Sequence, residues 1–284
     1  MRLVTPPAST TADGNIAVRD LTFHYRATGD PAAPPVVMLH GIMGHAREWD
    51  VVVQSLASTY RVYAVDQRGH GLTDWAEHYS ATAMADDLIA LVEALELDHP
   101  SVIGHSMGGM AAMLAAARRP DLIDRIVVID IGPDSVSGPL AAELREFVHT
   151  LGTSTYGSID EAVAQWSGDP MARPHLVRHY VEHGLTSCDD QRLKWRFDGA
   201  GLAQFFDEVS EAELWGAVDR ITCPVLLVRG EHSPVLSADT AAEMVRRFAD
   251  GQLVVIGDGA HDLGVQQPEA VASAAAHFLR ADAA

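Results

Sequence analysis

A serine flanked by glycines is the residue in this chain best suited to covalent chemistry. Gly104-His105-Ser106-Met107-Gly108 fits G-x-S-x-G, a pattern typical of a sharp turn from a strand into a helix that exposes the serine hydroxyl. The two glycines give the strained turn the room it needs. A serine hydroxyl becomes a nucleophile only when a histidine removes its proton, an acid orients that histidine, and backbone amides stabilise the oxyanion. The motif therefore predicts acyl transfer with Ser106 as nucleophile.

The neighbouring segments supply the strand and the helix that this turn requires. Pro100 to Ile103 reads as a short buried strand, and Met110 to Arg119 as an alanine-rich helix that Pro120 ends. The N-terminus of the helix points its positive end at any charge that forms at the serine. The context thus strengthens a motif that would be weak on its own.

Position along the chain selects a base from the 14 histidines. His261 follows Gly257-Asp258-Gly259-Ala260, a loop between the last predicted strand and the closing helix. Where this strand–turn–helix form of the motif carries the nucleophile, the histidine comes last along the chain. We therefore predict that His261 is the base, and we expect His40 to brace its own loop.

Strands that alternate with helices predict a doubly wound, mostly parallel α/β sheet. Ligands bind such sheets beyond the carboxyl ends of the strands, where Ser106, Asp130 and His261 fall. Residues 1–13 read as a loose tail, and residues 16–28 as two edge strands. The remaining strands are expected at 35–39, 60–65, 101–103, 125–130, 224–228 and 252–256, and the helices at about 48–58, 82–97, 110–119, 237–248 and 268–280.

The pattern changes in the middle of the chain. From residue 133 to about 220 we find helices and loops but no convincing strand. We therefore expect a core of residues 1–132 and 221–284, with a helical cap inserted at residues 133–220. An apolar pocket should form under this cap, lined by Ile42, Met43, Met107 and the cap aromatic residues Trp166, Phe205 and Phe206.

Composition limits the classes of molecule that this chain can bind. The 284 residues carry a net charge of −19 and a single lysine, Lys194, so the surface should repel nucleic acid and anionic membranes. Two cysteines without metal-type spacing, no signal-like start and no membrane-length apolar run predict a cytoplasmic protein. We expect no nucleotide cofactor and no metal, not even at His175, His179 and His183, despite their helical spacing. A homodimer is compatible with the sequence.

Four motifs together resemble the α/β-hydrolase family. They are His40-Gly41-Ile42-Met43-Gly44, Asp66-Gln67-Arg68-Gly69-His70-Gly71, Gly104-His105-Ser106-Met107-Gly108-Gly109 and Gly259-Ala260-His261. The resemblance runs from about Thr22 to Leu279 and implies a Ser-His-acid triad without a cofactor. It also implies an oxyanion hole formed by the amides of Ile42 and Met107, with Gly41 letting the loop approach. A serine nucleophile argues against haloalkane dehalogenases and epoxide hydrolases, which use aspartate.

The acid departs from the usual family pattern. Relatives with a similar loop often carry aspartate at the place that Pro234 occupies, and proline cannot orient a histidine. Asp130 ends the apolar run Ile126 to Ile129, where an unpaired charge would be costly. This arrangement resembles a serine esterase-like subgroup in which the acid follows the strand that precedes the cap. We predict Asp130 as the acid and keep Glu231 and Asp258 as alternatives.

The resemblance implies a hydrolase of small to medium apolar carboxylic esters that works through an acyl-enzyme. The same triad also serves lactones, thioesters, carbon–carbon bonds and perhydrolysis. A non-catalytic ligand receptor on this fold is the alternative from another class.

Overall fold

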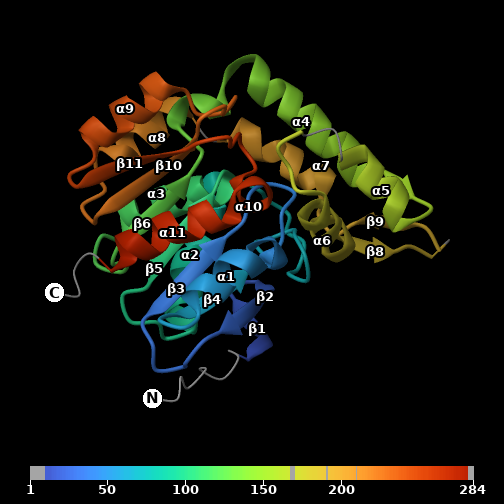
Figure 1. The fold of residues 1–284 in the computed structure, drawn as a ribbon, viewed down its shortest axis with the longest axis horizontal. Coiled ribbons are helices and arrows are strands. Elements are labelled where there is room, and N and C mark those ends of the chain that lie inside the picture. The colour runs from blue at the N-terminus through green and yellow to red at the C-terminus, as the bar shows by residue number, and fades with distance from the viewer. Residues whose placement is uncertain (1–9, 167–169, 190, 209, 281–284) are drawn as a thin grey trace, which may run out of the picture.

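The structure, a computed structural model, describes residues 10–166, 170–189, 191–208 and 210–280. One eight-stranded sheet runs through these residues in the order β1-β2-β4-β3-β5-β6-β10-β11 (Figure 1). Every neighbouring pair from β4 across to β11 is parallel, whereas β2 pairs antiparallel with both β1 and β4. The predicted doubly wound, mostly parallel sheet is confirmed. Its strands are β1 (Thr11–Val18), β2 (Leu21–Thr28), β3 (Pro35–Leu39), β4 (Arg61–Val65), β5 (Ser101–His105), β6 (Ile126–Ile129), β10 (Val225–Gly230) and β11 (Gly251–Ile256).

Helices cover both faces of this sheet because its central strands are apolar on both sides. On β3, Val36 and Met38 belong to the core beneath α1 and α11, which cross in front of the strands in Figure 1. Val37 and Leu39 belong to the opposite core, together with apolar residues of α2, α3 and α9. The helices of the two layers are α1 (Asp50–Leu56), α2 (Ala81–Ala94), α3 (Met107–Arg118), α9 (Ala238–Arg247), α10 (Leu263–Gln266) and α11 (Pro268–Leu279), with short 3₁₀ turns η1 (Ala46–Trp49) and η2 (Pro133–Val136).

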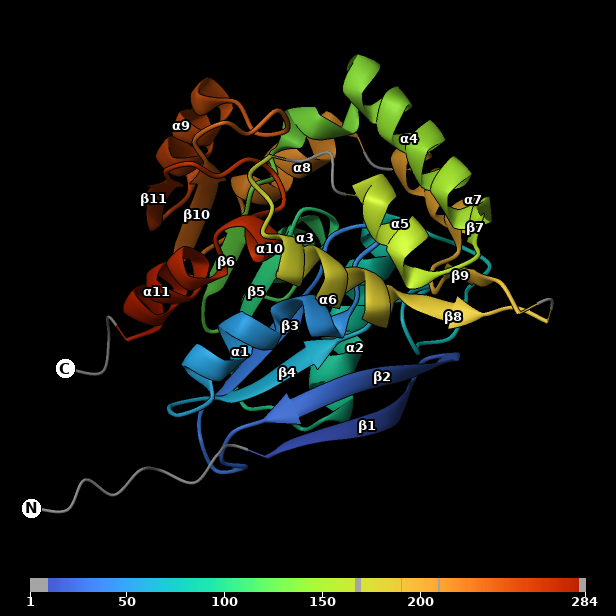
Figure 2. The same cartoon turned by 45° about the vertical axis from the view of Figure 1, so that its right-hand side comes forward.

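The segment between β6 and β10 holds helices and also a small second sheet. The expectation of no strand in residues 133–220 was wrong, because three short antiparallel strands lie in the order β7-β9-β8 (Figure 2). Strands of two or three residues are too short to leave a clear alternation of apolar and polar residues. The elements are α4 (Gly138–Thr153), β7 (Thr155–Tyr156), α5 (Ile159–Trp166), α6 (Pro174–Gly184), β8 (Leu185–Ser187), β9 (Leu193–Trp195), α7 (Gly199–Leu202), η3 (Ala203–Asp207) and α8 (Glu211–Val218).

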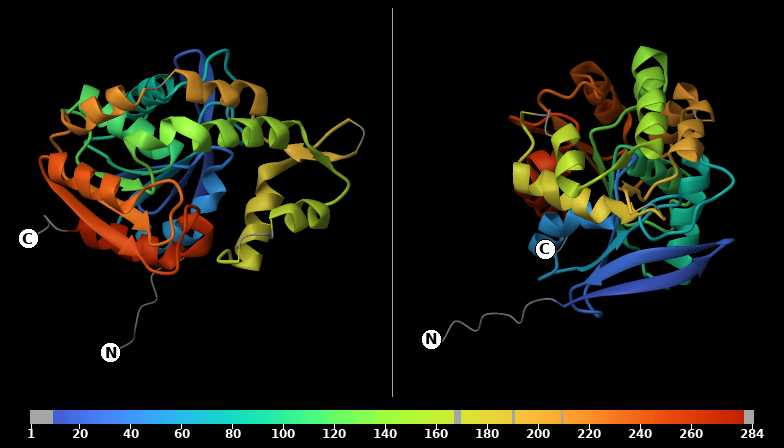
Figure 3. Two further views of the ribbon diagram at one scale, coloured as in Figure 1. Left: turned by 90° about the horizontal axis from the view of Figure 1, so that it is seen from above. Right: turned by 90° about the vertical axis from the view of Figure 1, so that its right-hand side faces the viewer.

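Seen from above, α4 reaches outward from the main sheet and connects to the group of α5, α6, β8 and β9 (Figure 3). The aromatic side chains of this group pack together. The ring of Trp166 lies 5.3 Å from that of Tyr180 and 5.4 Å from that of Trp195, centroid to centroid. This cluster packs α5, α6 and β9 together, and it fixes the positions of Trp166 and Tyr180.

The N-terminal region differs from expectation in two details. Strand β1 begins at Thr11, so the predicted tail of residues 1–13 is too long, and residues 1–9 lie outside the described part. Strand β2 is not an edge strand, since it pairs with β4 as well as β1. Among the described helices, none has the length and apolar character needed to cross a bilayer.

Candidate active site

Ser106 sits on a strained turn between β5 and α3. Its backbone adopts φ 50° and ψ −117°, a conformation that residues other than glycine seldom take. A side chain at Gly104 would collide with the carbonyl oxygen of Gly108, and one at Gly108 would lie 2.5 Å from the carbonyl oxygen of Leu39. The two glycines are therefore required by close backbone contacts on either side of the serine.

The structure brings together three residues that lie far apart in the sequence. Ser106 Oγ lies 3.1 Å from His261 Nε2, and His261 Nδ1 lies 2.9 Å from Asp130 Oδ2. Because the carboxylate can only accept, Nδ1 carries the hydrogen, which leaves Nε2 as the acceptor for the serine hydroxyl. Asp130 is completely buried, whereas the His261 side chain is 21% exposed and can reach a substrate.

Two further donors hold the Asp130 carboxylate in place. The Gly230 amide donates to Oδ1 at 2.9 Å, and the Ser233 hydroxyl donates to Oδ2 at 2.6 Å. The Ser233 oxygen in turn accepts from the amides of Val235 and Leu236, so its hydrogen is directed at the carboxylate. Sequence reasoning missed Ser233. Its position was a usable signal, because it lies in the loop after β10, and β10 pairs in parallel with β6, the strand that Asp130 follows.

The two other candidate acids lie elsewhere. Glu231 and Asp258 are both exposed, and the Glu231 carboxylate accepts a hydrogen bond from the Asp258 amide at 3.3 Å. Neither side chain makes a hydrogen bond to His261 among the described residues. The loop that holds Pro234 still takes part in the site, but through the Ser233 hydroxyl and the Gly230 amide instead of a carboxylate.

The acidic surroundings favour the charged form of His261. Burial by itself would lower the pKa of this imidazole, but the hydrogen bond to Asp130 and the charges of Asp262 and Asp130 outweigh it, so the pKa is raised above 6.5. An imidazole whose pKa is raised takes up a proton more readily than a free imidazole does.

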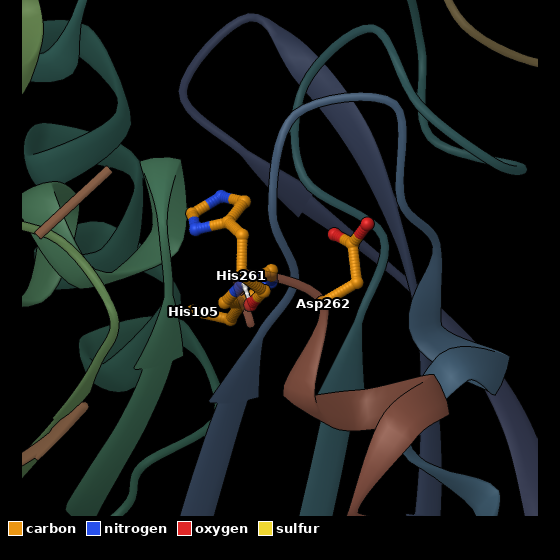
Figure 4. A group of neighbouring side chains, drawn as sticks. All are labelled: His105, His261 and Asp262. Atoms are coloured by element: carbon orange, nitrogen blue, oxygen red, sulfur yellow. Dashed lines mark hydrogen bonds between the residues drawn. The ribbon is translucent and has the colours of Figure 1, made fainter. Parts of the chain in front are cut away.

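A second histidine, His105, holds the backbone of His261 by a hydrogen bond. His105 Nε2 donates to the His261 carbonyl oxygen at 2.9 Å, and the two rings lie 4.8 Å apart, centroid to centroid. Burial and the neighbouring His261 lower the pKa of His105 to about 4, so its ring is neutral. Because Nε2 carries the hydrogen, Nδ1 carries none. Figure 4 shows both imidazoles together with Asp262, the next residue along the loop.

The loop after β3 lies beside the serine. Gly41, Ile42 and Met43 line the same cavity as Ser106. The Met43 backbone, at φ 69°, is held from two sides: its amide donates to His70 Nε2 at 3.2 Å, and its carbonyl accepts from the Tyr180 hydroxyl at 2.7 Å. Burial lowers the pKa of His70 to about 4, which keeps Nε2 an acceptor.

Met107 lies differently from the prediction in one respect. Its amide is the first of α3, directly after the serine, where helix amides have no partner within the helix. Its side chain, however, is 1% exposed and belongs to the core, not to the cavity lining. The predicted lining by Met107 is therefore wrong, because the helix turns this side chain inward against the sheet.

A cavity of about 310 Å³ opens beside Ser106 and His261. The segment between β6 and β10 contributes most of its apolar wall. Phe205 and Phe206, two expected lining residues, pack in the core instead, while the expected Trp166 does line the cavity. The other apolar lining residues are Ile42, Met43, Leu140, Leu144, Phe147, Ala172, Val177, Tyr180, Val235 and Val265.

Two groups of side chains in the described part bring potential metal ligands together. His105, His261 and Asp262 offer atoms within 4.8 Å of one another, as do the exposed Glu231, His232 and Asp258. In the first group both ring nitrogens of His261 are already engaged, with Ser106 and Asp130. On α6, no such group forms among the described residues His175, His179 and His183.

A family model described as alpha/beta hydrolase fold matches residues 34–268. The chain belongs to the α/β-hydrolase family.

Individual α/β-hydrolases resemble it over nearly its full length. A 2-(acetamidomethylene)succinate hydrolase of Mesorhizobium japonicum is 31% identical over 264 residues, which cover 92% of each chain. An esterase of Mycobacterium tuberculosis is 31% identical over 254 residues, covering 84% of this chain and 80% of the esterase. Among solved structures, an E-2-(acetamidomethylene)succinate hydrolase superposes with a TM-score of 0.87 at 28% identity, over 96% of this chain and all of the other. These likenesses support a hydrolase.

Proposed function

We propose that this α/β-hydrolase cleaves carboxylic esters through an acyl-enzyme formed on Ser106. The observation that carries the proposal is the pair of contacts at His261, with Ser106 Oγ at 3.1 Å on one nitrogen and Asp130 Oδ2 at 2.9 Å on the other. Nucleophile, base and orienting acid thus stand in the order that acyl transfer needs.

Each step can be assigned to a group of this chain. Ser106 Oγ attacks the ester carbonyl while His261 Nε2 takes the hydroxyl proton, and the amides of Ile42 and Met107 stabilise the oxyanion. His261 then gives the proton to the departing alcohol oxygen as the carbon–oxygen bond breaks. A water, deprotonated by the same nitrogen, attacks the acyl-enzyme and releases the acid. Asp130 keeps the hydrogen on Nδ1 and stabilises the imidazolium in both halves of the reaction.

We also propose that residues 133–220 act as a cap on a core of residues 1–132 and 221–284 and set substrate choice. The support is that Leu140, Leu144, Phe147, Trp166, Val177 and Tyr180 supply much of the apolar cavity wall. Binding against an apolar wall removes the apolar surface of the substrate from water, which is favourable. The wall therefore favours aliphatic or aromatic acyl and alcohol groups.

The cavity does not favour the substrate class for which the Mesorhizobium japonicum hydrolase is named. That hydrolase is named for a succinate, and recognition of carboxylate groups ordinarily uses arginine or lysine. Among the described residues that line the cavity there is neither. The esterase names among the relatives agree better with the apolar wall seen here.

The experiment is a panel of p-nitrophenyl esters of increasing acyl length, with a lactone and a thioester added. We expect the highest kcat/KM on an ester, with Ser106→Ala inactive on it. Faster turnover of the lactone or thioester would replace the ester assignment while keeping the triad. A slow or single turnover with tight product retention would favour a ligand receptor instead.

A further inference from the structure

One end of the otherwise apolar cavity is acidic. Glu48, in the 3₁₀ turn η1, and Asp262, directly after the base, both line the cavity. The Glu48 side chain is only 8% exposed, while Asp262 is exposed. Both carboxyl groups approach His105: Glu48 Oε1 lies 4.0 Å from its Nδ1, and an Asp262 oxygen lies within 4.8 Å of a ring nitrogen.

Glu48 lacks a cationic partner in the described part of the chain. Its one ring-nitrogen contact is with His105, which is neutral because burial holds its pKa at about 4. Burial first, and then the charge of Asp262, raise the pKa of Glu48 well above 4.5, although backbone hydrogen bonds at Gly41 and His45 act in the opposite direction. A buried carboxyl group beside a second carboxylate is the environment that a bound cation relieves most.

Aromatic side chains line the same cavity. Phe147, Trp166 and Tyr180 all line it, with ring centroids 6.5 Å apart for Phe147 and Trp166 and 5.3 Å apart for Trp166 and Tyr180. Aromatic rings attract ammonium groups through their negative faces, most strongly in a site shielded from water. Two carboxyl groups and three aromatic rings, with no lysine or arginine among the described lining residues, are together the chemistry that recognises a cation.

We propose that Glu48 and Asp262 bind an ammonium group of the substrate, so that this enzyme prefers esters with a cationic acyl or alcohol part to anionic esters of the same size. The proposal rests on the proposed ester hydrolysis and deepens it, since it names the substrate class of the same cavity. Glu48 is the specificity-determining residue in it, and Asp262, the exposed carboxylate of the pair, supports it.

The expected preference for cationic over uncharged over anionic esters follows from the cost of desolvation. A carboxylate entering this cavity loses its water, meets no cation and approaches Asp262, so its binding is weak. An ammonium group loses its water as well, but it gains two carboxyl groups and the aromatic rings of the cavity wall. An uncharged ester meets neither effect and should fall between the two.

The turnover test compares three p-nitrophenyl esters that differ in one terminal group: pentanoate, 4-(trimethylammonio)butanoate and hemiglutarate. In the wild type we expect kcat/KM for the cationic ester to exceed that for the anionic ester by roughly 10- to 100-fold. Glu48→Gln keeps the shape of the side chain and should reduce this ratio about tenfold, and Asp262→Asn should reduce it less. Glu93→Gln, an exposed carboxylate bound to Arg119 on the outside of α2, is the matched control and should leave the ratio unchanged.

A binding test separates this inference from the esterase proposal. Isothermal titration of Ser106→Ala with hexyltrimethylammonium and with hexanoate needs no turnover, and the ammonium should bind at least about tenfold more tightly. The double variant Ser106→Ala/Glu48→Gln should lose most of that difference. Equal binding of the two ligands, tighter binding of hexanoate, or a difference that survives Glu48→Gln would overturn the inference even if esters are hydrolysed. The expected binding without hydrolysis of any ester would instead leave the cation site standing and remove the esterase assignment.

Discussion

The substitution Asp130→Asn tests the acid with an almost unchanged side-chain shape. Three donors converge on this buried carboxylate: the Gly230 amide on Oδ1, and the Ser233 hydroxyl and His261 Nδ1 on Oδ2. An asparagine has one oxygen for them and an amino group that only donates. If the amino group took the Oδ1 position it would face the Gly230 backbone N–H, which cannot reverse its role. The amino group must therefore replace Oδ2.

In that orientation the asparagine donates to His261 and reverses its tautomer. Nδ1 becomes the acceptor, Nε2 carries the hydrogen, and the ring can no longer take the proton of Ser106. The same exchange in a serine protease triad lowers kcat by ~10⁴, or about 5 kcal/mol of transition-state stabilisation, and we expect a loss of that order here. Loss of a charged hydrogen bond should also cost about 2 kcal/mol of folding free energy and lower Tm by roughly 4–8 °C.

The assay is kcat on one p-nitrophenyl ester, with thermal unfolding as the control for folding. Glu231→Gln and Asp258→Asn are matched exchanges of a carboxylate for an amide on exposed residues of the same region, and both should stay within about threefold of the wild type. An Asp130→Asn protein that folds and retains more than a tenth of the wild-type kcat would refute the reasoning. Should the variant unfold, the nuclear magnetic resonance signal of the His261 Nδ1 proton in the wild type reports whether that nitrogen donates to a carboxylate.

Three further predictions follow from the same geometry. His261 must be neutral to accept a proton, and its pKa is raised above 6.5, so kcat/KM should rise with pH through an apparent pKa above that value. Asp130→Asn should lower this apparent pKa. A rate that is flat between about pH 5 and 8 would exclude His261 as the base. Ser233→Ala removes the hydroxyl that donates to Asp130 and should lower kcat about tenfold with little change in KM, whereas Ser233→Thr should retain most activity; an unchanged kcat in Ser233→Ala would show that the hydroxyl does not position the acid. Trp166→Ala enlarges the cavity and should shift the preference among p-nitrophenyl esters toward longer acyl chains, and an equal loss on all chain lengths would argue against a role for this side chain in selectivity.

The sequence predicts those parts of the fold that depend on local pattern. The run Ser101 to Gly109 encodes a strand, a strained turn and a helix start within nine consecutive positions, and the structure has all three. The central strands are continuous apolar runs, which is the mark of a sheet covered on both faces. Strands β7, β8 and β9 escaped prediction because each has two or three residues and depends on its partners for its conformation.

Features of the site that depend on distant contacts could not be predicted in the same way. Because Pro234 stands where relatives often carry the acid, the sequence pointed to Asp130 instead. It did not show that Ser233 and Gly230, which lie 100 or more residues further along the chain, donate hydrogen bonds to the Asp130 carboxylate. Glu48 reads as an ordinary helix-start carboxylate in the sequence, because nothing local shows that its side chain is buried in the cavity. Phe205 and Phe206 were expected at the cavity because they are aromatic, but burial in the core has the same sequence signature.

The most direct test of the central claim is covalent labelling of Ser106. Intact-protein mass spectrometry after treatment with a fluorophosphonate, followed by peptide mapping, locates the nucleophile without any assumption about the natural substrate. We predict one adduct per chain on the peptide that contains Ser106, no adduct in Ser106→Ala, and much slower labelling in Asp130→Asn, where the base holds the wrong tautomer. Equal labelling of the wild type and Ser106→Ala, or an adduct on another residue, would contradict the account.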